Sequence, residues 1–131
     1  MIVKLAYGIM RSAAVPRRDG VGCTQGGSSL GYDQMCPHYQ AAIRLLGKKW
    51  TGLLVRVLLG GPRRFTDFKK QIPELSDRLL AERLRELEDA GIVTRIVHAD
   101  RPVVVEYRLT QKGQELAPVV EAIQAWADRW Y

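Results

Sequence analysis

The side chains best suited to recognising a partner lie between Ser76 and Arg85. On a helix over residues 76–90, where successive residues turn by about 100°, polar side chains gather opposite a row of leucines. The leucines are Leu79, Leu80, Leu84 and Leu87; the opposite side carries Arg78, Ala81, Glu82 and Arg85, with Ser76 and Asp77 at the N-terminal end. Arginine can bond guanine bidentately or pair with phosphate, and a small alanine lets a helix lie close to base edges. The pattern predicts a DNA-contacting face; the alternative is a solvated face on which Glu82 offsets neighbouring arginines. Arg83 lies nearer the core edge of this helix, and we expect it to be a structural ion-pair residue.

The segment before this helix predicts a partner helix and a tight turn. Residues 64–72 carry apolar side chains at helical spacing. Pro73 then ends that helix, because the residue before a proline is pushed out of the helical region. Ser76 is a natural N-cap for the next helix, and Gly91 suits the end of it. Two helices joined in this way form a helix-turn-helix.

The segment after Gly91 predicts a β-hairpin. The apolar period changes from helical to about 2, which indicates strands over residues 92–97 and 103–109 joined by a loop at residues 98–102. A hairpin directly after a helix-turn-helix acts as a wing, because the helix fills the major groove of DNA while the loop reaches the backbone or the adjacent minor groove.

Three further helices complete the predicted fold. One begins at Cys36-Pro37 and ends near Gly47, a second covers about residues 49–59, and a third follows its cap Thr110. The second should be central to the core, through Trp50, Leu53, Leu54, Val57 and Leu58. The predicted fold class is mainly α with a small β-hairpin (α+β): a winged helix-turn-helix with additional N- and C-terminal dimerisation helices.

The charge of the chain favours a polyanionic partner without locating the contact. Among 131 residues, 20 lysines and arginines against 14 acidic residues leave a net charge of +6, which suits nucleic acid or an acidic membrane surface. Residues 63–89 contain seven basic and seven acidic residues, so DNA binding requires the cations to gather on one face. The cations expected near phosphates are Arg63, Arg64, Lys69, Lys70 and Arg101.

Composition also limits the class of protein. With 47% apolar and 26% charged residues, a core can form. No apolar stretch approaches the ~20 residues that cross a bilayer, and the first apolar run is too short for a secretion signal. Two cysteines do not make a disulfide framework. We therefore expect a cytoplasmic protein without a membrane partner.

The first 34 residues differ from the rest of the chain. Six of the twelve glycines lie there, and residues 16–31 offer almost nothing to bury, so ordering them would cost entropy without apolar return. A phosphate-binding loop is the alternative, but no Gly-Lys-Ser/Thr follows the glycines. We expect a flexible Gly/Ser-rich extension over residues 1–34 and one folded domain over residues 35–131.

A set of motifs runs in a fixed order from Cys36 to about Trp130. They are Cys36-Pro37, Gly47-Lys48-Lys49-Trp50-Thr51, Gly61-Pro62-Arg63-Arg64-Phe65, Ser76 with Leu80, Arg83-Leu84-Arg85-Glu86-Leu87-Glu88, Gly91-Ile92-Val93, and Val105-Glu106-Tyr107-Arg108-Leu109-Thr110 with Gly113. In order and spacing, this stretch resembles the HxlR-type winged helix-turn-helix transcription regulators. The resemblance implies a homodimer that binds operator DNA and represses or activates nearby genes.

An aromatic strip on the last predicted helix independently suggests self-association. Trp126 and Trp130 fall on the same side as Ile123, and a two-fold dimer needs a self-complementary apolar surface of this kind. The alternative is that both tryptophans fold back onto their own subunit. A symmetric dimer would meet two half-sites about one helical turn apart.

Cys36 has two interpretations. A thiol at a helix N-terminus can have a lowered pKa, because the helix dipole favours the thiolate, and it can then react with oxidants or electrophiles. It can equally be a small buried hydrophobe. The resemblance suggests the first, since several relatives of this type sense such chemicals through a cysteine near this position. Cys23 is a candidate disulfide partner for Cys36.

Other kinds of chemistry have little support in the sequence. His38 and His98 stand on separate segments without a nucleophile, base or metal motif, so we expect no enzyme and no catalytic residue. A zinc site built from these histidines with Cys23 and Cys36 lacks paired-ligand spacing, so we expect no cofactor or metal. The competing function is a winged-helix module that binds protein through the same face, without specific DNA binding.

Overall fold

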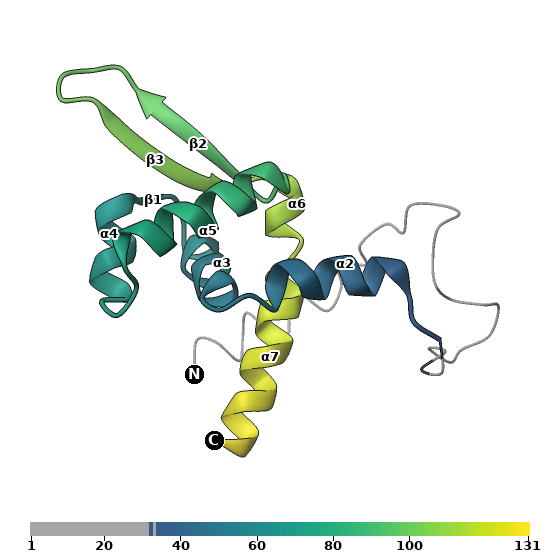
Figure 1. The fold of residues 1–131 in the computed structure, drawn as a ribbon. Helices are drawn as coiled ribbons and strands as arrows, with labels where there is room; N and C mark the ends of the chain where they lie inside the picture. The colour runs from purple at the N-terminus through teal and green to yellow at the C-terminus, as the bar shows by residue number, and fades with distance from the viewer. Residues whose placement is uncertain (1–31, 33) are drawn as a thin grey trace. The chain divides into compact units, whose positions relative to one another are not determined.

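The computed structural model describes Tyr32 and residues 34–131. The chain divides into two compact units between Lys48 and Lys49, and the labels in Figure 1 identify the elements of each. Most of the extension predicted over residues 1–34 lies outside the described residues, so that domain boundary stays a prediction. No helix in the described part of the chain is long and apolar enough to cross a membrane.

The described helix of the N-terminal unit is α2 (Pro37–Leu46). Cys36 is its N-cap, and Pro37 occupies the first turn, where a missing N–H removes no hydrogen bond. Gly47 closes the helix by donating its N–H to the carbonyl of Ile43 at 2.7 Å. The predicted bounds of this helix are confirmed.

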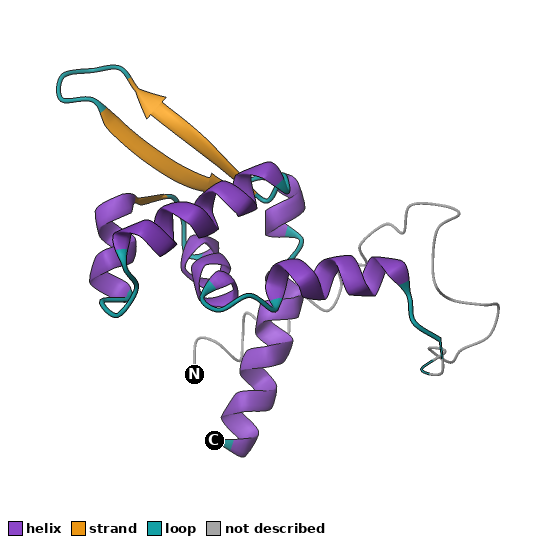
Figure 2. Cartoon of the chain, in the orientation of Figure 1, coloured by secondary structure: helices purple, strands orange, loops and turns teal. Residues whose placement is uncertain are grey.

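The second unit is mostly helical with a small antiparallel sheet (Figure 2). Its elements are α3 (Thr51–Leu59), β1 (Arg63–Arg64), α4 (Phe65–Gln71), α5 (Asp77–Asp89), β2 (Val93–His98), β3 (Val104–Leu109), α6 (Gln111–Gln114) and α7 (Ala117–Trp130). The strand order is β1-β3-β2, and the β2–β3 hairpin projects beyond the helices. This arrangement confirms the predicted fold class of a mainly α, winged helix-turn-helix protein.

The core of the second unit lies where α3, α4 and α5 meet the base of the sheet. Its buried apolar side chains come from these elements and the turns that follow α4 and α5: Leu54, Val55, Leu58, Phe68, Ile72, Leu75, Leu80, Leu84, Leu87, Ile92, Val93 and Leu109. The Phe68 ring meets the edge of Tyr107 of β3, with 6.2 Å between ring centroids. Removing these side chains from water is the main force that holds the helix-turn-helix against the base of the wing.

The inner side of α3 differs from the prediction. Leu53, predicted to be core, is 48% exposed, whereas Val55 is fully buried. Trp50 precedes the helix as its N-cap and is only half-buried. The segment is apolar on most sides, so its periodicity could not show which side faces inward.

The single predicted C-terminal helix is two helices in the structure. Thr110 caps α6, its hydroxyl accepting the N–H of Gly113 at 3.2 Å, as predicted. The helix then breaks, and α7 restarts with Pro118 in its first turn. Proline has no N–H to donate to the carbonyl four residues earlier, so a continuous helix is disfavoured here.

The sheet has a third strand that the sequence did not predict. Arg63 of β1 pairs with Tyr107, and Arg64 pairs with Glu106. The prediction placed Arg64 in the following helix instead. Two residues are too few to show a period, and only the presence of β3 alongside makes this segment a strand.

Candidate nucleic-acid interface

Helix α5 presents one buried and one exposed side. Leu80, Leu84 and Leu87 are at most 1% exposed, whereas Leu79 is only half-buried. The residues predicted to face a partner are all exposed: Ser76, Asp77, Arg78, Ala81, Glu82 and Arg85. Within its own unit, the helix therefore leaves a side with two arginines and a small alanine open to a partner.

The N-terminal end of α5 is fastened to α4. The Ser76 hydroxyl accepts the backbone N–H of Leu79 at 3.2 Å, which is the N-cap predicted from the sequence. Lys69 of α4 donates to the Leu75 carbonyl and pairs with Asp77 at 3.1 Å. Lys69, predicted to lie near phosphate, thus ties together the turn of the helix-turn-helix.

The C-terminal end of α5 is held by residues that follow the wing. Lys112 donates to the carbonyl of Ala90 at 2.7 Å. The Thr110 hydroxyl donates to the carbonyl of Gly91 and to that of Ile92, the latter at 3.2 Å. Gly91 has a φ of 73°, a left-handed conformation that glycine adopts at little cost. These bonds fix the base of the wing against the end of α5.

The wing is a two-stranded ribbon whose tip carries Arg101. β2 pairs with β3 from Val93–Leu109 to His98–Val104, so His98 belongs to the strand and not to the predicted loop. Arg101 is exposed. On the ribbon, Glu106 Oε1 lies 3.4 Å from Arg108 Nη2 and 3.8 Å from His98 Nε2, so one carboxylate offsets nearby positive charge.

The cations flanking α4 differ in accessibility. Arg64 and Lys70 are exposed, and the backbone N–H of Arg64 donates to Asp67 Oδ2 at 2.8 Å at the start of α4. Arg63 is half-buried against the preceding turn, and its Nη1 donates to the carbonyl of Pro62 at 3.0 Å. Of the two adjacent arginines, Arg64 is the more open to a phosphate.

Arg83 lies on the inner edge of α5, as the sequence predicted. Its side chain is 14% exposed, and its Nη1 is 3.2 Å from Glu86 Oε1. The predicted ion-pair role is therefore confirmed. A second bond, from Arg83 Nε to the carbonyl of Lys49 at 3.0 Å, joins residues 34 positions apart and had no signal in the sequence.

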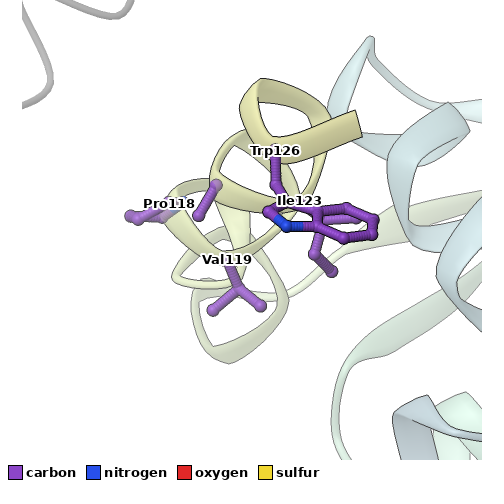
Figure 3. Close-up of a pocket in the computed structure, with 5 residues that line it drawn as sticks. Pro118, Val119, Ile123 and Trp126 are labelled. Atoms are coloured by element: carbon purple, nitrogen blue, oxygen red, sulfur yellow. The ribbon is translucent and has the colours of Figure 1, made fainter. Parts of the chain in front are cut away.

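Helix α7 exposes an apolar strip. Ile123, Trp126 and Trp130 are 62%, 56% and 65% exposed. Figure 3 shows Ile123 and Trp126 beside Val119 and Pro118, where together with Ala122 they line a shallow pocket. Large apolar side chains exposed side by side along one helix are typical of an interaction surface.

Cys36 is disulfide-bonded in the structure. Cys23, the second cysteine of the chain and the partner proposed from the sequence, lies outside the described residues. The described residues contain no group of three or more histidines, cysteines or acidic residues placed to hold a metal ion.

A helix-turn-helix with an open second helix, followed directly by a β-ribbon, defines a winged-helix regulator. Comparison with known proteins identifies the family: the HxlR-like helix-turn-helix family matches residues 45–131. The chain belongs to the HxlR family, as its motifs predicted. It is a transcriptional regulator, and its relatives form a non-enzymatic family.

Two relatives with solved structures are similar over most of the chain. The HTH-type transcriptional regulator YodB of Bacillus subtilis (strain 168) is 49% identical over 96 residues, which are 73% of this chain and 86% of YodB. The reduced form of YodB matches with a TM-score of 0.68 at 48% identity, over 74% of this chain and 95% of that chain. The quinone-bound form of YodB matches with a TM-score of 0.64 at 47% identity, over 73% of this chain and 100% of that chain. The redox regulator HypR in its oxidised form matches with a TM-score of 0.69 at 35% identity, over 72% of this chain and 97% of that chain.

Proposed function

We propose that this chain is a sequence-specific, double-stranded DNA-binding regulator that acts as a homodimer in the cytoplasm. Helix α5 enters the major groove, and the wing loop meets the backbone or the adjacent minor groove. The observation that supports this most directly is the exposed side of α5, which carries Arg78 and Arg85, on the helix that the β2–β3 wing follows directly.

The exposed side of α5 supplies the base contacts in this proposal. Arg78 and Arg85 each bond guanine bidentately or pair with phosphate, and Ala81 between them allows close approach to base edges. Glu82 can accept a hydrogen bond from the amino group of cytosine. Ser76 contacts phosphate near the helix start, where the N-terminal end of the helix dipole and Asp77 set the local charge.

Contacts to phosphate come from cations around α5. Arg64, Lys70 and Arg101 are exposed on three separate segments, and Arg63 adds positive charge beside Arg64. Phosphate contacts of this kind position a protein on the duplex without reading its sequence. They also make binding weaken as salt concentration rises, because each contact releases condensed counterions.

Dimerisation uses the apolar strip of α7 in this proposal. Ile123, Trp126 and Trp130 are each more than half exposed, and a second copy of the strip would remove them from water. A two-fold dimer presents two α5 helices to two half-sites of an inverted repeat.

The effector class follows from the relatives and from the position of Cys36. YodB has been solved in quinone-bound and diamide-treated forms, and HypR in oxidised and reduced forms. Cys36 is the N-cap of α2. We infer that, in the reduced protein, oxidants or electrophiles that reach the Cys36 thiol change the affinity of this chain for its operator.

A gel-shift titration with the DNA upstream of the gene tests the DNA-binding proposal. The variant Arg78→Ala/Arg85→Ala should lose about 1–3 kcal/mol for each arginine that reads a base. For each arginine that instead pairs with phosphate, the slope of log affinity against log salt should fall by about 1. The matched control Arg44→Ala/Arg56→Ala removes the same charge from exposed positions on α2 and α3, and should bind nearly as wild type.

The same titration separates this proposal from a protein-interaction module. Binding that ignores both salt and the α5 substitutions would contradict DNA recognition by this face. Equal weakening in the α5 variant and in the control would show only a general charge effect. An inverted repeat protected from nuclease digestion would support the dimeric arrangement.

A further inference from the structure

The chain has a strained residue where its two units join. The boundary falls between Lys48 and Lys49, and Trp50 directly after it has φ 78° and ψ −23°. Among the described residues, Trp50 is the only non-glycine residue with a positive φ. A bulky residue in the left-handed region is unfavourable, and it persists only where surrounding contacts hold it.

The contact that holds this junction comes from α5. Arg83 Nε donates to the carbonyl of Lys49 at 3.0 Å. That carbonyl belongs to the peptide group between Lys49 and Trp50, so the bond restrains the strained backbone itself. The ammonium of Lys49 lies 5.0 Å from the centre of the Trp50 ring, which adds a cation–π contact at the same place.

Acidic residues on α5 orient the Arg83 guanidinium for this bond. Nη1 donates to both carboxylate oxygens of Glu86, at 3.2 and 3.3 Å, and lies 3.9 Å from Glu82. With Nη1 engaged along the helix, the Nε edge of the planar group faces the Lys49 carbonyl. The Arg83 side chain is 14% exposed and the Glu86 side chain 25%, so solvent screens these contacts only in part.

We propose that Arg83 is a positioning residue for DNA recognition: it latches α5 to the junction between the two units. This inference rests on the proposed function, in which the opposite side of α5 meets DNA. Arg83 itself does not touch the duplex. It sets the position of α5 relative to the start of α3, and it couples that position to the backbone through which the N-terminal unit is attached.

Coupling of this kind acts in both directions. A displacement of Lys49 that breaks its bond to Arg83 would shift α5. Conversely, DNA bound by α5 would stabilise that bond, because linkage between two equilibria is reciprocal.

Limited digestion with a lysine-specific protease tests the latch without DNA. Cleavage after Lys49 requires its carbonyl to leave Arg83, so the variant Arg83→Gln should be cut there about fivefold faster, as expected when one hydrogen bond no longer opposes a local opening step. Cleavage after Lys112 in the same protein reports general unfolding and should not change. Arg85→Gln is the matched control on the exposed side of α5, and should be cut like wild type.

DNA binding then distinguishes positioning from direct contact. Arg83→Gln should weaken operator binding severalfold with an unchanged salt slope, whereas Arg85→Gln should weaken it with a lower slope. A lowered slope for Arg83→Gln would overturn the positioning role, and unchanged cleavage after Lys49 would overturn the latch. Failure of the wild-type protein to bind any upstream DNA would overturn the proposed function, a result distinct from these two.

A second variant covers the case in which Arg83→Gln fails to fold. Glu86→Gln keeps Arg83 but removes the charge that orients it, so cleavage after Lys49 should rise about twofold and operator binding should weaken with the slope unchanged. A Glu86→Gln protein that matches wild type in both measurements would overturn the proposal.

Discussion

Two arginines on α5 show how the side of a helix decides what a residue does. Arg85 is exposed, whereas the Arg83 side chain is 14% exposed and bonded to a carboxylate and to a backbone carbonyl. Residues two positions apart on a helix point to nearly opposite sides. The spacing of the leucines was therefore enough to predict that Arg85 faces outward and that Arg83 is an ion-pair residue.

At Cys36, we expect serine to remove the response of operator binding to oxidants. The reduced wild-type protein should change its affinity for operator DNA after treatment with diamide or with a benzoquinone, and Cys36→Ser should not, because hydroxyl groups do not undergo thiol oxidation or addition. Gel shifts before and after treatment measure this. Cys23→Ser is the informative control: it should lose a response that needs a disulfide between the two cysteines but keep a response to quinone addition at Cys36. A Cys36→Ser protein that still responds like wild type would eliminate the sensor proposal.

For each helix and strand, the central residues were easier to predict than the residues where it ends or the segment that it pairs with. The helix-turn-helix and the wing followed from period, proline and capping residues. The short strand β1 did not, because it needs β3 beside it. The break between α6 and α7 was missed although Pro118, in the first turn of α7, is a local signal for a new helix start. The two ends of α5 are likewise held by Lys69 and Lys112, whose partners are backbone carbonyls with no sequence signature.

The close approach of α6 to the base of the wing gives a prediction for stability. A Cβ at Gly113 would lie 2.3 Å from the carbonyl oxygen of Ile92 and 2.9 Å from Leu109 Cδ2. Gly113→Ala should therefore destabilise the fold by about 1–3 kcal/mol through overpacking. Gly52→Ala is the control: a Cβ there meets nothing within 4 Å, so helix α3 should gain about 0.5–1 kcal/mol. Denaturant unfolding measures both, and shifts in the same direction would contradict this interpretation of the packing.

At the scale of the whole molecule, the strip of Ile123, Trp126 and Trp130 on α7 is an apolar surface that the described part of its own unit leaves exposed. The proposal of a two-fold dimer covers this surface with a second copy of the same strip. A dimer would also double the number of α5 helices presented to DNA, which raises affinity for paired half-sites without any new contact.

Charge placed in the α7 strip should separate the two copies. We expect Ile123→Glu/Trp126→Glu to shift the protein from dimer to monomer in sedimentation, because two carboxylates would be buried in an apolar interface. Thermal unfolding of a diluted sample should change little, since both side chains are more than half exposed within one chain. Ala125→Glu adds charge to an exposed position of α7 outside the strip and should remain dimeric. A wild-type protein that sediments as a monomer at high concentration would refute the dimer.

Local chemistry along the chain is enough to predict the helix-turn-helix, the wing and the two sides of α5. Each depends on residues within a few positions of one another: leucines at helical spacing, Pro73 before a turn, Ser76 at a cap, and alternation in the wing.

Which side of α3 faces the core, why residues 63–64 form a strand, and how Arg83 reaches Lys49 depended instead on the tertiary structure. These features arise between segments far apart in the sequence, and an apolar helix or a lone arginine has several partners that would satisfy it equally well. Only the packing of the folded chain selects one of them.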